Sequence, residues 1–158
     1  DLVRNSLRMR PDRIIVGEVR GKEAFDMLQA MNTGHEGSIT TLHSNSPEDA
    51  VSRLETMLLM NDMELPVSAV RGYIANAIDI IIQIDRMSDG RRRITSICEV
   101  VDLKDLKVEM KEIFAFTQKG IADDNSVIGE FSFSKKVPLV YDKIKRKGIN
   151  TIDDLFKK

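Results

Sequence analysis

The 158-residue sequence lacks a second cysteine, a large net charge and a long apolar run. Because Cys98 is its single cysteine, an internal disulfide is excluded and a reducing compartment fits. The 24 basic and 25 acidic side chains nearly cancel, which argues against broad nucleic-acid binding. No apolar run approaches the roughly 18 residues that a membrane-spanning helix needs. Cys98 lies in an apolar, strand-like stretch, so we expect a small core side chain there rather than a nucleophile.

The sequence also lacks a phosphate-binding loop of the G-x-x-x-x-G-K-[ST] type, whose backbone N–H groups cradle nucleotide phosphates. The nearest stretch begins at Gly17, but its two glycines are one residue too close together. Glu23 replaces the hydroxyl residue that would meet Mg²⁺. Two histidines, His35 and His43, and one cysteine are too few for a structural zinc site, which takes four ligands.

The first half of the chain alternates strand and helix signals. Ile14-Ile15-Val16 and Ile80-Ile81-Ile82 are short continuous apolar runs, typical of strands covered on both faces in parallel sheets. A further strand is predicted over residues 38–42. Ser46-Pro47 predicts a helix start, with Ser46 as the cap and Pro47 in the first helical position. Other helices are predicted over residues 1–9, over residues 21–31 and from Pro66 onward.

The second half is predicted to be largely antiparallel. Asp89-Gly90 is a strong hairpin signal between strands at residues 78–84 and 92–101. The remaining expected features are strands at 108–116 and 131–133, a mobile loop at 121–129, a helix at 138–146 and a helix start at 151–154. The predicted fold class is therefore α/β, with parallel strands and helices followed by an antiparallel hairpin or meander and short C-terminal helices.

One acidic residue, Glu18, follows the apolar run that ends at Val16. Ligands of open parallel sheets bind beyond the carboxyl ends of the strands. An acid there is the general form of a Walker B site, where the carboxylate helps to hold Mg²⁺ or orients the attacking water. An ion pair with Arg13 or Arg20 explains Glu18 equally well, and both interpretations stay open.

The two histidines flank the strand predicted over residues 38–42 on opposite sides. His43 follows that strand, at the edge where ligands bind. His35 precedes it, which puts it at the opposite edge or folded back toward a neighbour. For each of them a single backbone hydrogen bond without any catalytic role is the simpler alternative.

Residues 7–20, Leu7-Arg8-x-x-Pro11-Asp12-x-Ile14-Ile15-Val16-Gly17-Glu18-Val19-Arg20, resemble the signature of the type II/IV secretion ATPases. The one departure is Gly21, where many members have aspartate. Residues 27–38 and 41–47 resemble the His box of the same family. Residues 27–47, 53–57 and 89–93 are similar to the CpaF branch, which serves Flp/Tad-type pili. The resemblance covers nearly the whole chain and is strongest from Leu7 to Val101.

The resemblance implies a RecA-like P-loop ATPase core that uses ATP and Mg²⁺. Glu18 would be the catalytic Walker B acid and would hold Mg²⁺ through water. His35 and His43 would be the catalytic His-box residues near the γ-phosphate, and Arg13 and Arg20 would be charge partners in cofactor binding. Since the family's Walker A loop and Asp box lie upstream of these motifs, we expect residues 1–158 to form the C-terminal part of one ATPase domain.

The resemblance also implies partners and a location. Members form homo-hexamers on the cytoplasmic side of an inner-membrane platform protein, peripheral to the membrane and associated with it through partners. We therefore expect a motor of secretion or pilus assembly, with no nucleic-acid partner. The alternative is a non-catalytic ring or interaction subunit that keeps the fold. A DNA-translocating ATPase is disfavoured by the near-zero net charge.

We predict that residues 1–158 alone do not hydrolyse ATP, because no Walker A loop is present to cradle the phosphates. Phosphate release from ATP and Mg²⁺ by the purified chain should stay at background. Magnesium-dependent turnover that disappears in the Glu18→Gln variant would contradict this prediction.

Overall fold

The structure is a computed structural model that describes residues 2–35, 37–60 and 65–149. The chain divides into two compact units, which are described separately. The first comprises Asp1–Ile78 and Asp102–Glu109, and the second comprises Asp79–Val101 and Met110–Lys158. The assignment of all 158 residues to one domain stays a prediction. No helix in the described ranges combines the length and apolar character needed to cross a membrane.

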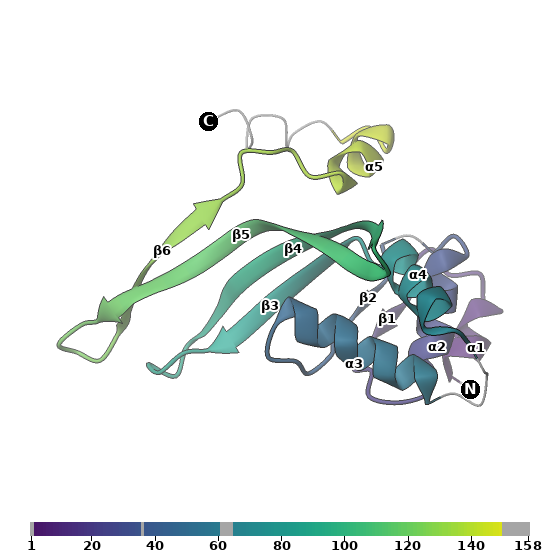
Figure 1. Ribbon diagram of the computed structural model, residues 1–158, viewed down its shortest axis with the longest axis horizontal. Helices are drawn as coiled ribbons and strands as arrows, with labels where there is room; N and C mark the ends of the chain where they lie inside the picture. Colours follow the sequence, from purple (N-terminus) through teal and green to yellow (C-terminus); the bar gives the residue numbers. More distant parts are fainter. Residues whose placement is uncertain (1, 36, 61–64, 150–158) are drawn as a thin grey trace. The chain divides into compact units, whose positions relative to one another are not determined.

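The first unit combines helices with a short parallel sheet (Figure 1). The sheet pairs Ile15 with Ile39 and Val16 with Thr40. Helix α2 contacts α1, α3 and α4, and α3 also contacts α4. The elements are α1 (Leu2–Leu7), β1 (Ile15–Val16), α2 (Glu23–Asn32), β2 (Ile39–Thr40), α3 (Pro47–Leu59) and α4 (Val67–Ala77). The predicted order of helices and strands is confirmed for this unit.

The core of the first unit comes mainly from apolar residues of α2, α3 and α4, together with Val19 from the segment after β1. The largest side chains that are fully buried here are Met27, Leu28, Leu58, Ile74, Val19 and Val70. Helix α3 begins as predicted, since the Ser46 hydroxyl accepts a hydrogen bond from the Asp49 amide at 3.1 Å and Pro47 opens the helix. The cap and the apolar stripe together fix where α3 starts and which face it buries.

The prediction that Ile14–Val16 is covered on both faces is wrong. Ile14 is buried, but Ile15 is 77% exposed and its partner Ile39 is 61% exposed. Successive side chains of a strand point to opposite faces. The side chain of Ile14 therefore lies on a buried face of the sheet, and those of Ile15 and Ile39 lie on an exposed face.

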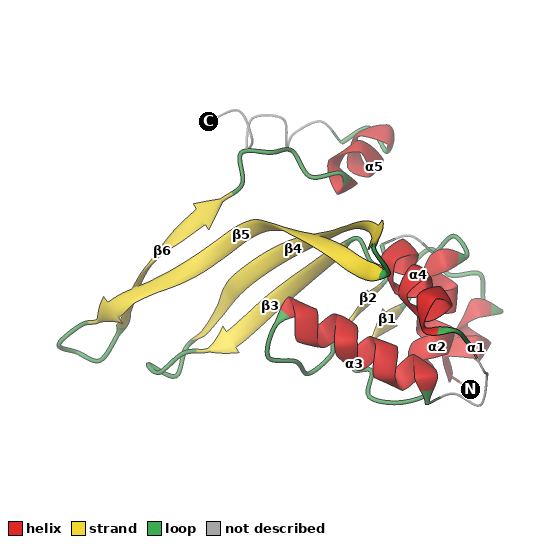
Figure 2. Cartoon of the chain, viewed as in Figure 1, coloured by secondary structure: helices red, strands yellow, loops and turns green. Residues whose placement is uncertain are grey.

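The second unit is a four-stranded antiparallel sheet in the order β3-β4-β5-β6, followed by helix α5 (Figure 2). Its elements are β3 (Ile80–Arg86), β4 (Arg92–Lys104), β5 (Lys107–Ile121), β6 (Val127–Phe133) and α5 (Val140–Arg146). The Asp89-Gly90 hairpin between β3 and β4 is confirmed. Cys98 is buried in β4, as expected. The ends of β4 and β5 that meet at residues 102–109 belong to the first unit, where Arg71 Nη1 donates to Leu106 O at 2.6 Å.

Two predictions for the second unit need correction. Ile80–Ile82 form part of the antiparallel sheet and are not covered on both faces, because Ile82 is 53% exposed. The loop predicted over residues 121–129 is a tight hairpin turn, since β5 continues to Ile121 and β6 starts at Val127. The turn is closed by the Ala122 N–H bond to Ser126 O at 2.8 Å, and Asp124 accepts from the Ser126 amide at 3.0 Å. The helix start predicted at residues 151–154 lies outside the described residues.

Gly129 of β6 lies under the ring of Phe116 on the neighbouring strand β5. A Cβ atom added to Gly129 would lie 2.3 Å from Phe116 Cζ and 2.8 Å from Thr117 O. Phe116 also contacts Phe131, with 5.0 Å between the ring centroids. A side chain at position 129 would therefore displace both the Phe116 ring and the backbone of β5 at Thr117.

The carboxylate of Asp89 connects the β3–β4 turn to the start of β6. It accepts bonds from both terminal nitrogens of Arg93 at 2.9 and 2.7 Å. It also accepts from the amides of Arg91 at 3.0 Å and Val127 at 3.1 Å. The hydrogen bonds from Arg93 hold the pKa of the Asp89 carboxyl far below its ordinary value.

We predict that Asp89→Asn lowers the melting temperature at neutral pH by several degrees, because the ion pair with Arg93 is lost. The folded-state pKa of Asp89 is depressed. Its contribution to stability is therefore complete above the unfolded-state pKa of about 4 and is lost as the pH falls through the folded-state value. The Asn variant should show a weaker fall in melting temperature below about pH 4 than the parent chain.

Thermal unfolding of the chain at a series of pH values measures this effect. Asp123→Asn is the matched control, since Asp123 is an exposed acid in the β5–β6 turn. Equal melting curves for the Asp89 and Asp123 variants would refute the assignment.

Candidate functional site

Glu18 lies two residues beyond the end of β1, and its carboxylate contacts two other side chains. Arg20 Nη2 donates to Glu18 Oε2 at 2.6 Å, and His43 Nε2 lies 3.2 Å from Glu18 Oε1. The Glu18 side chain is 30% exposed, whereas those of Arg20 and His43 are 76% and 85% exposed. We call Glu18, Arg20 and His43 the Glu18 cluster. It presents one partly sheltered carboxylate and two exposed nitrogen-bearing side chains at the carboxyl edge of the parallel sheet.

Backbone pairing beyond the strand ends positions the Glu18 cluster. The Val19 amide donates to Thr41 O at 2.9 Å, and the Thr41 hydroxyl donates to Gly17 O. The segments that leave β1 and β2 are thereby held side by side, which brings His43 to Glu18. Val19 is 1% exposed and anchors this segment in the core of the first unit.

Glu23, the first residue of α2, is a polar contributor that the sequence did not single out. Its Oε1 atom accepts hydrogen bonds from the amides of Arg20 at 2.9 Å and Gly21 at 3.1 Å. The bond from the Arg20 amide lowers the pKa of the Glu23 carboxyl below its ordinary value. The available sequence signal was an acid in the first turn of a predicted helix, which by itself indicates only a favourable charge at the helix N-terminus.

His35 and Arg13 lie at the other edge of the parallel sheet, where β1 and β2 begin. His35 Nδ1 is 3.2 Å from Ala30 O in α2, and its carbonyl accepts from the Ser38 hydroxyl at 2.8 Å. The same hydroxyl accepts from the Ile14 amide at 2.9 Å. Arg13 packs against Gly37, where an added Cβ would lie 3.0 Å from Arg13 Nε. The structure thus brings Glu18, Arg20 and His43 together but leaves His35 and Arg13 at the opposite edge.

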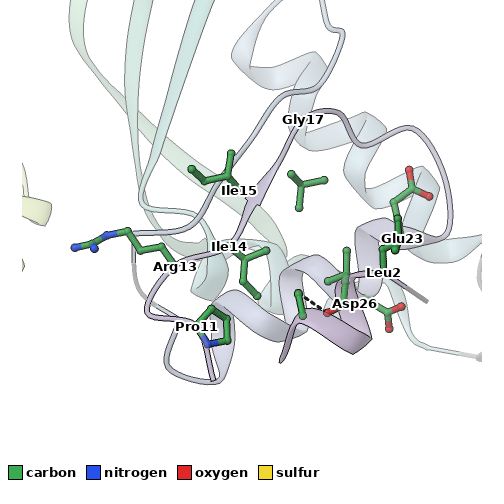
Figure 3. Close-up of a pocket in the computed structure, with 11 residues that line it drawn as sticks. Leu2, Pro11, Arg13, Ile14, Ile15, Gly17, Glu23 and Asp26 are labelled. Atoms are coloured by element: carbon green, nitrogen blue, oxygen red, sulfur yellow. Dashed lines mark hydrogen bonds between the residues drawn. The ribbon is translucent and has the colours of Figure 1, made fainter. Parts of the chain in front are cut away.

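A depression of about 640 Å³ lies between α1, β1 and the start of α2 (Figure 3). Arg4 of α1 and Asp26 of α2 form an ion pair there, with Arg4 Nε 2.9 and 3.0 Å from the two carboxylate oxygens. Figure 3 shows the Arg13 side chain extending away from the carboxylates of Glu23 and Asp26. The depression is lined by Leu2, Val3, Ser6, Pro11, Arg13, Ile14, Ile15, Val16, Gly17, Glu23 and Asp26. It borders the Glu18 cluster at Gly17, but no member of the cluster lines it.

Among the described residues, no three His, Cys, Asp or Glu side chains are grouped so that they could hold a metal ion. Within the Glu18 cluster a metal would thus find a single carboxylate, that of Glu18, which would bind the metal directly or through a water. Mg²⁺ commonly keeps several waters and takes one or two carboxylates together with phosphate oxygens. The donor set of the Glu18 cluster fits such a magnesium–phosphate group in kind: Glu18 would supply a carboxylate for the metal or its water, and Arg20 and His43 would supply N–H donors for oxyanions.

In comparisons with known proteins, the chain matches secretion and conjugal-transfer proteins. The family described as "Type II/IV secretion system protein" matches residues 1–126. The putative conjugal transfer protein Rv3659c of Mycobacterium tuberculosis is 35% identical over 135 residues, which cover 85% of this chain and 37% of that protein. The type IV secretion system protein PtlH of Bordetella pertussis is 42% identical over 101 residues, covering 61% of this chain and 30% of that protein.

A solved structure supports the fold class. The crystal structure of the VirB11 ATPase from the Brucella suis type IV secretion system, in complex with sulphate, matches with a TM-score of 0.59 and 35% identity. The match covers 62% of this chain and 30% of that one. The predicted α/β fold is thereby confirmed. The chain spans 37% or less of the length of these three relatives.

We predict that Ser38→Ala destabilises the fold and that His43→Ala leaves its stability nearly unchanged. Ser38 bridges Ile14 and His35 with two hydrogen bonds, so its loss should lower the free energy of unfolding by about 1–2 kcal/mol. The His43 side chain is 85% exposed, and its removal should change that free energy by less than about 0.5 kcal/mol. Urea unfolding of both variants measures the difference. Equal destabilisation would show that His43 is a structural residue.

Proposed function

Because the chain belongs to the type II/IV secretion system protein family, we propose that it is the C-terminal portion of the ATPase domain of a hexameric secretion or pilus-assembly motor. The observation that carries the proposal is the Glu18 cluster. An acid at the carboxyl edge of a parallel sheet, flanked by an arginine and a histidine, suits a nucleotide-hydrolysis site. The match of the family to residues 1–126 supports the same assignment.

In the proposed site, Glu18 is the Walker B acid. Bound Mg-ATP supplies the phosphoryl group and the metal charge. Glu18 orients the attacking water or a metal-bound water through its carboxylate, as a strand-end acid can do at the edge where ligands bind. Arg20, 2.6 Å from Glu18, holds that carboxylate in place. His43 is exposed and within 3.2 Å of Glu18, so its imidazole can donate toward a phosphate oxygen at the same edge.

The proposal extends to His35 and Arg13 on the sequence resemblance alone. Both lie where β1 and β2 begin, so they would meet a different part of the assembled site from the one that Glu18 faces. Their proposed roles are a His-box catalytic residue and a charge partner of the cofactor. The phosphate-cradling loop of this site is proposed to lie in the part of the protein that precedes these residues.

Two kinds of secretion or assembly system are proposed for this chain. The similarity of residues 27–47, 53–57 and 89–93 to the CpaF branch supports Flp/Tad pilus assembly. The names of the relatives support type IV secretion or conjugal transfer. In either case we propose a homo-hexamer on the cytoplasmic side of an inner-membrane platform protein, peripheral to the membrane. The near-zero net charge gives no support for a nucleic-acid partner.

We predict that Glu18→Gln in the complete protein leaves nucleotide binding intact and lowers kcat about a hundredfold or more. The glutamine amide keeps the shape of the glutamate side chain. It does not accept a proton at neutral pH, and it binds a metal-bound water more weakly than the carboxylate does. Steady-state ATP hydrolysis and equilibrium binding of an ATP analogue measure the two effects. Glu48→Gln is the control, because Glu48 is an exposed acid in the first turn of α3. An unchanged kcat would leave Glu18 as an ion-pair partner of Arg20 without a catalytic role. Absence of ATP hydrolysis by the complete parent protein would instead favour a non-catalytic ring subunit.

A further inference from the structure

We infer that Glu23 is a positioning residue of the proposed nucleotide site. Its carboxylate fixes the turn that carries Arg20, and thereby fixes the Arg20 guanidinium against Glu18. The inference rests on the proposed function, because the position of Arg20 matters for hydrolysis only if Glu18 is the catalytic acid.

The turn before α2 is organised by the side chain of Glu23. One carboxylate oxygen accepts from two successive amides, those of Arg20 at 2.9 Å and Gly21 at 3.1 Å. The other oxygen, Oε2, would lie 3.1 Å from a Cβ atom added to Gly21, so the carboxylate is packed directly on the turn. Lys22, the residue that precedes the helix, supplies no side-chain cap. Glu23 therefore satisfies backbone donors that a conventional capping residue would not reach.

Arg20 depends on this turn more than on packing. Its side chain is 76% exposed, so few neighbouring atoms restrict its direction. The backbone before it is held where the Val19 amide meets Thr41 O, and the backbone at and after it is held by Glu23. Loss of the Glu23 bonds would leave the turn after Arg20 held by the bond from the Ala24 amide to Gly21 O, at 3.1 Å, and would free the amides of Arg20 and Gly21. The 2.6 Å contact between Arg20 and Glu18 would then compete with many other directions of a mobile guanidinium.

A simpler explanation for an acid at this position is a favourable interaction with the positive end of the α2 dipole. The two explanations differ in what they require of the side chain. Positioning requires an acceptor oxygen that reaches both amides, whereas the dipole requires only a negative charge near the helix start. Glutamine keeps the reach and loses the charge. Aspartate keeps the charge but is one methylene too short to reach the amides in the same way.

The test compares Glu23→Gln and Glu23→Asp in the complete protein. We expect kcat of the Gln variant to stay within about threefold of the parent, and kcat of the Asp variant to fall about tenfold at a nearly unchanged KM for ATP. The dipole explanation predicts the opposite order. Glu48→Gln and Glu48→Asp are the matched controls in the first turn of α3, and both should leave kcat unchanged.

Hydrogen exchange at the Arg20 and Gly21 amides of the same proteins is the second readout. Exchange should accelerate about tenfold in the Asp variant and stay close to the parent rate in the Gln variant. The inference is overturned if the Gln variant is impaired as much as the Asp variant, or if these amides exchange faster while kcat is unchanged. An unchanged kcat in Glu18→Gln would refute the proposed role of Glu18 in hydrolysis by itself, while the exchange rates would still report whether Glu23 holds the turn.

Discussion

The parallel pairing of β1 with β2 is the constraint on which the candidate site depends. Each strand has only two residues, but the Ile39 amide donates to Ile14 O at one end and the Val19 amide donates to Thr41 O at the other. This register makes the segments beyond the strands run together, so that Glu18 and His43 meet. A one-residue slip of a strand exchanges the faces of all its side chains. Such a slip would separate the carboxylate from the imidazole and would also take Ile14 out of the core.

The features that could be predicted from the sequence depend on few neighbouring residues. The start of α3 follows from Ser46 and Pro47, and the β3–β4 hairpin follows from Asp89-Gly90. Each signal depends on residues within about four positions along the chain. The ion pair considered for Glu18 is confirmed with Arg20, two residues away along the same segment. The pair does not exclude a catalytic role, because holding a carboxylate in place is also what such a role requires.

The features that could not be predicted depend on segments far apart in the chain, or on signals that fit more than one structure. The exposure of Ile15 depends on which face the helices cover, and an apolar run does not contain that information. The sequence places His35 before β2 and His43 after it but leaves open whether His35 folds back, and that depends on its contact with Ala30 O in α2. The acids and the asparagine at residues 123–125 were interpreted as a loop, although the same residue types also close tight turns. Glu23 was missed because its partners are backbone amides, which no pattern of side chains reveals.

The close approach of Phe116 to Gly129 also bears on how this protein can vary during evolution. The two residues lie on neighbouring strands, and an added Cβ at position 129 would overlap the ring. Substitution at one position therefore changes which residues the other position accepts. A larger residue at 129 needs a smaller side chain at 116 and also a shift of the Thr117 carbonyl, because the added Cβ would lie 2.8 Å from Thr117 O. Among close relatives with this sheet geometry, position 129 should therefore stay glycine wherever position 116 is a large aromatic residue.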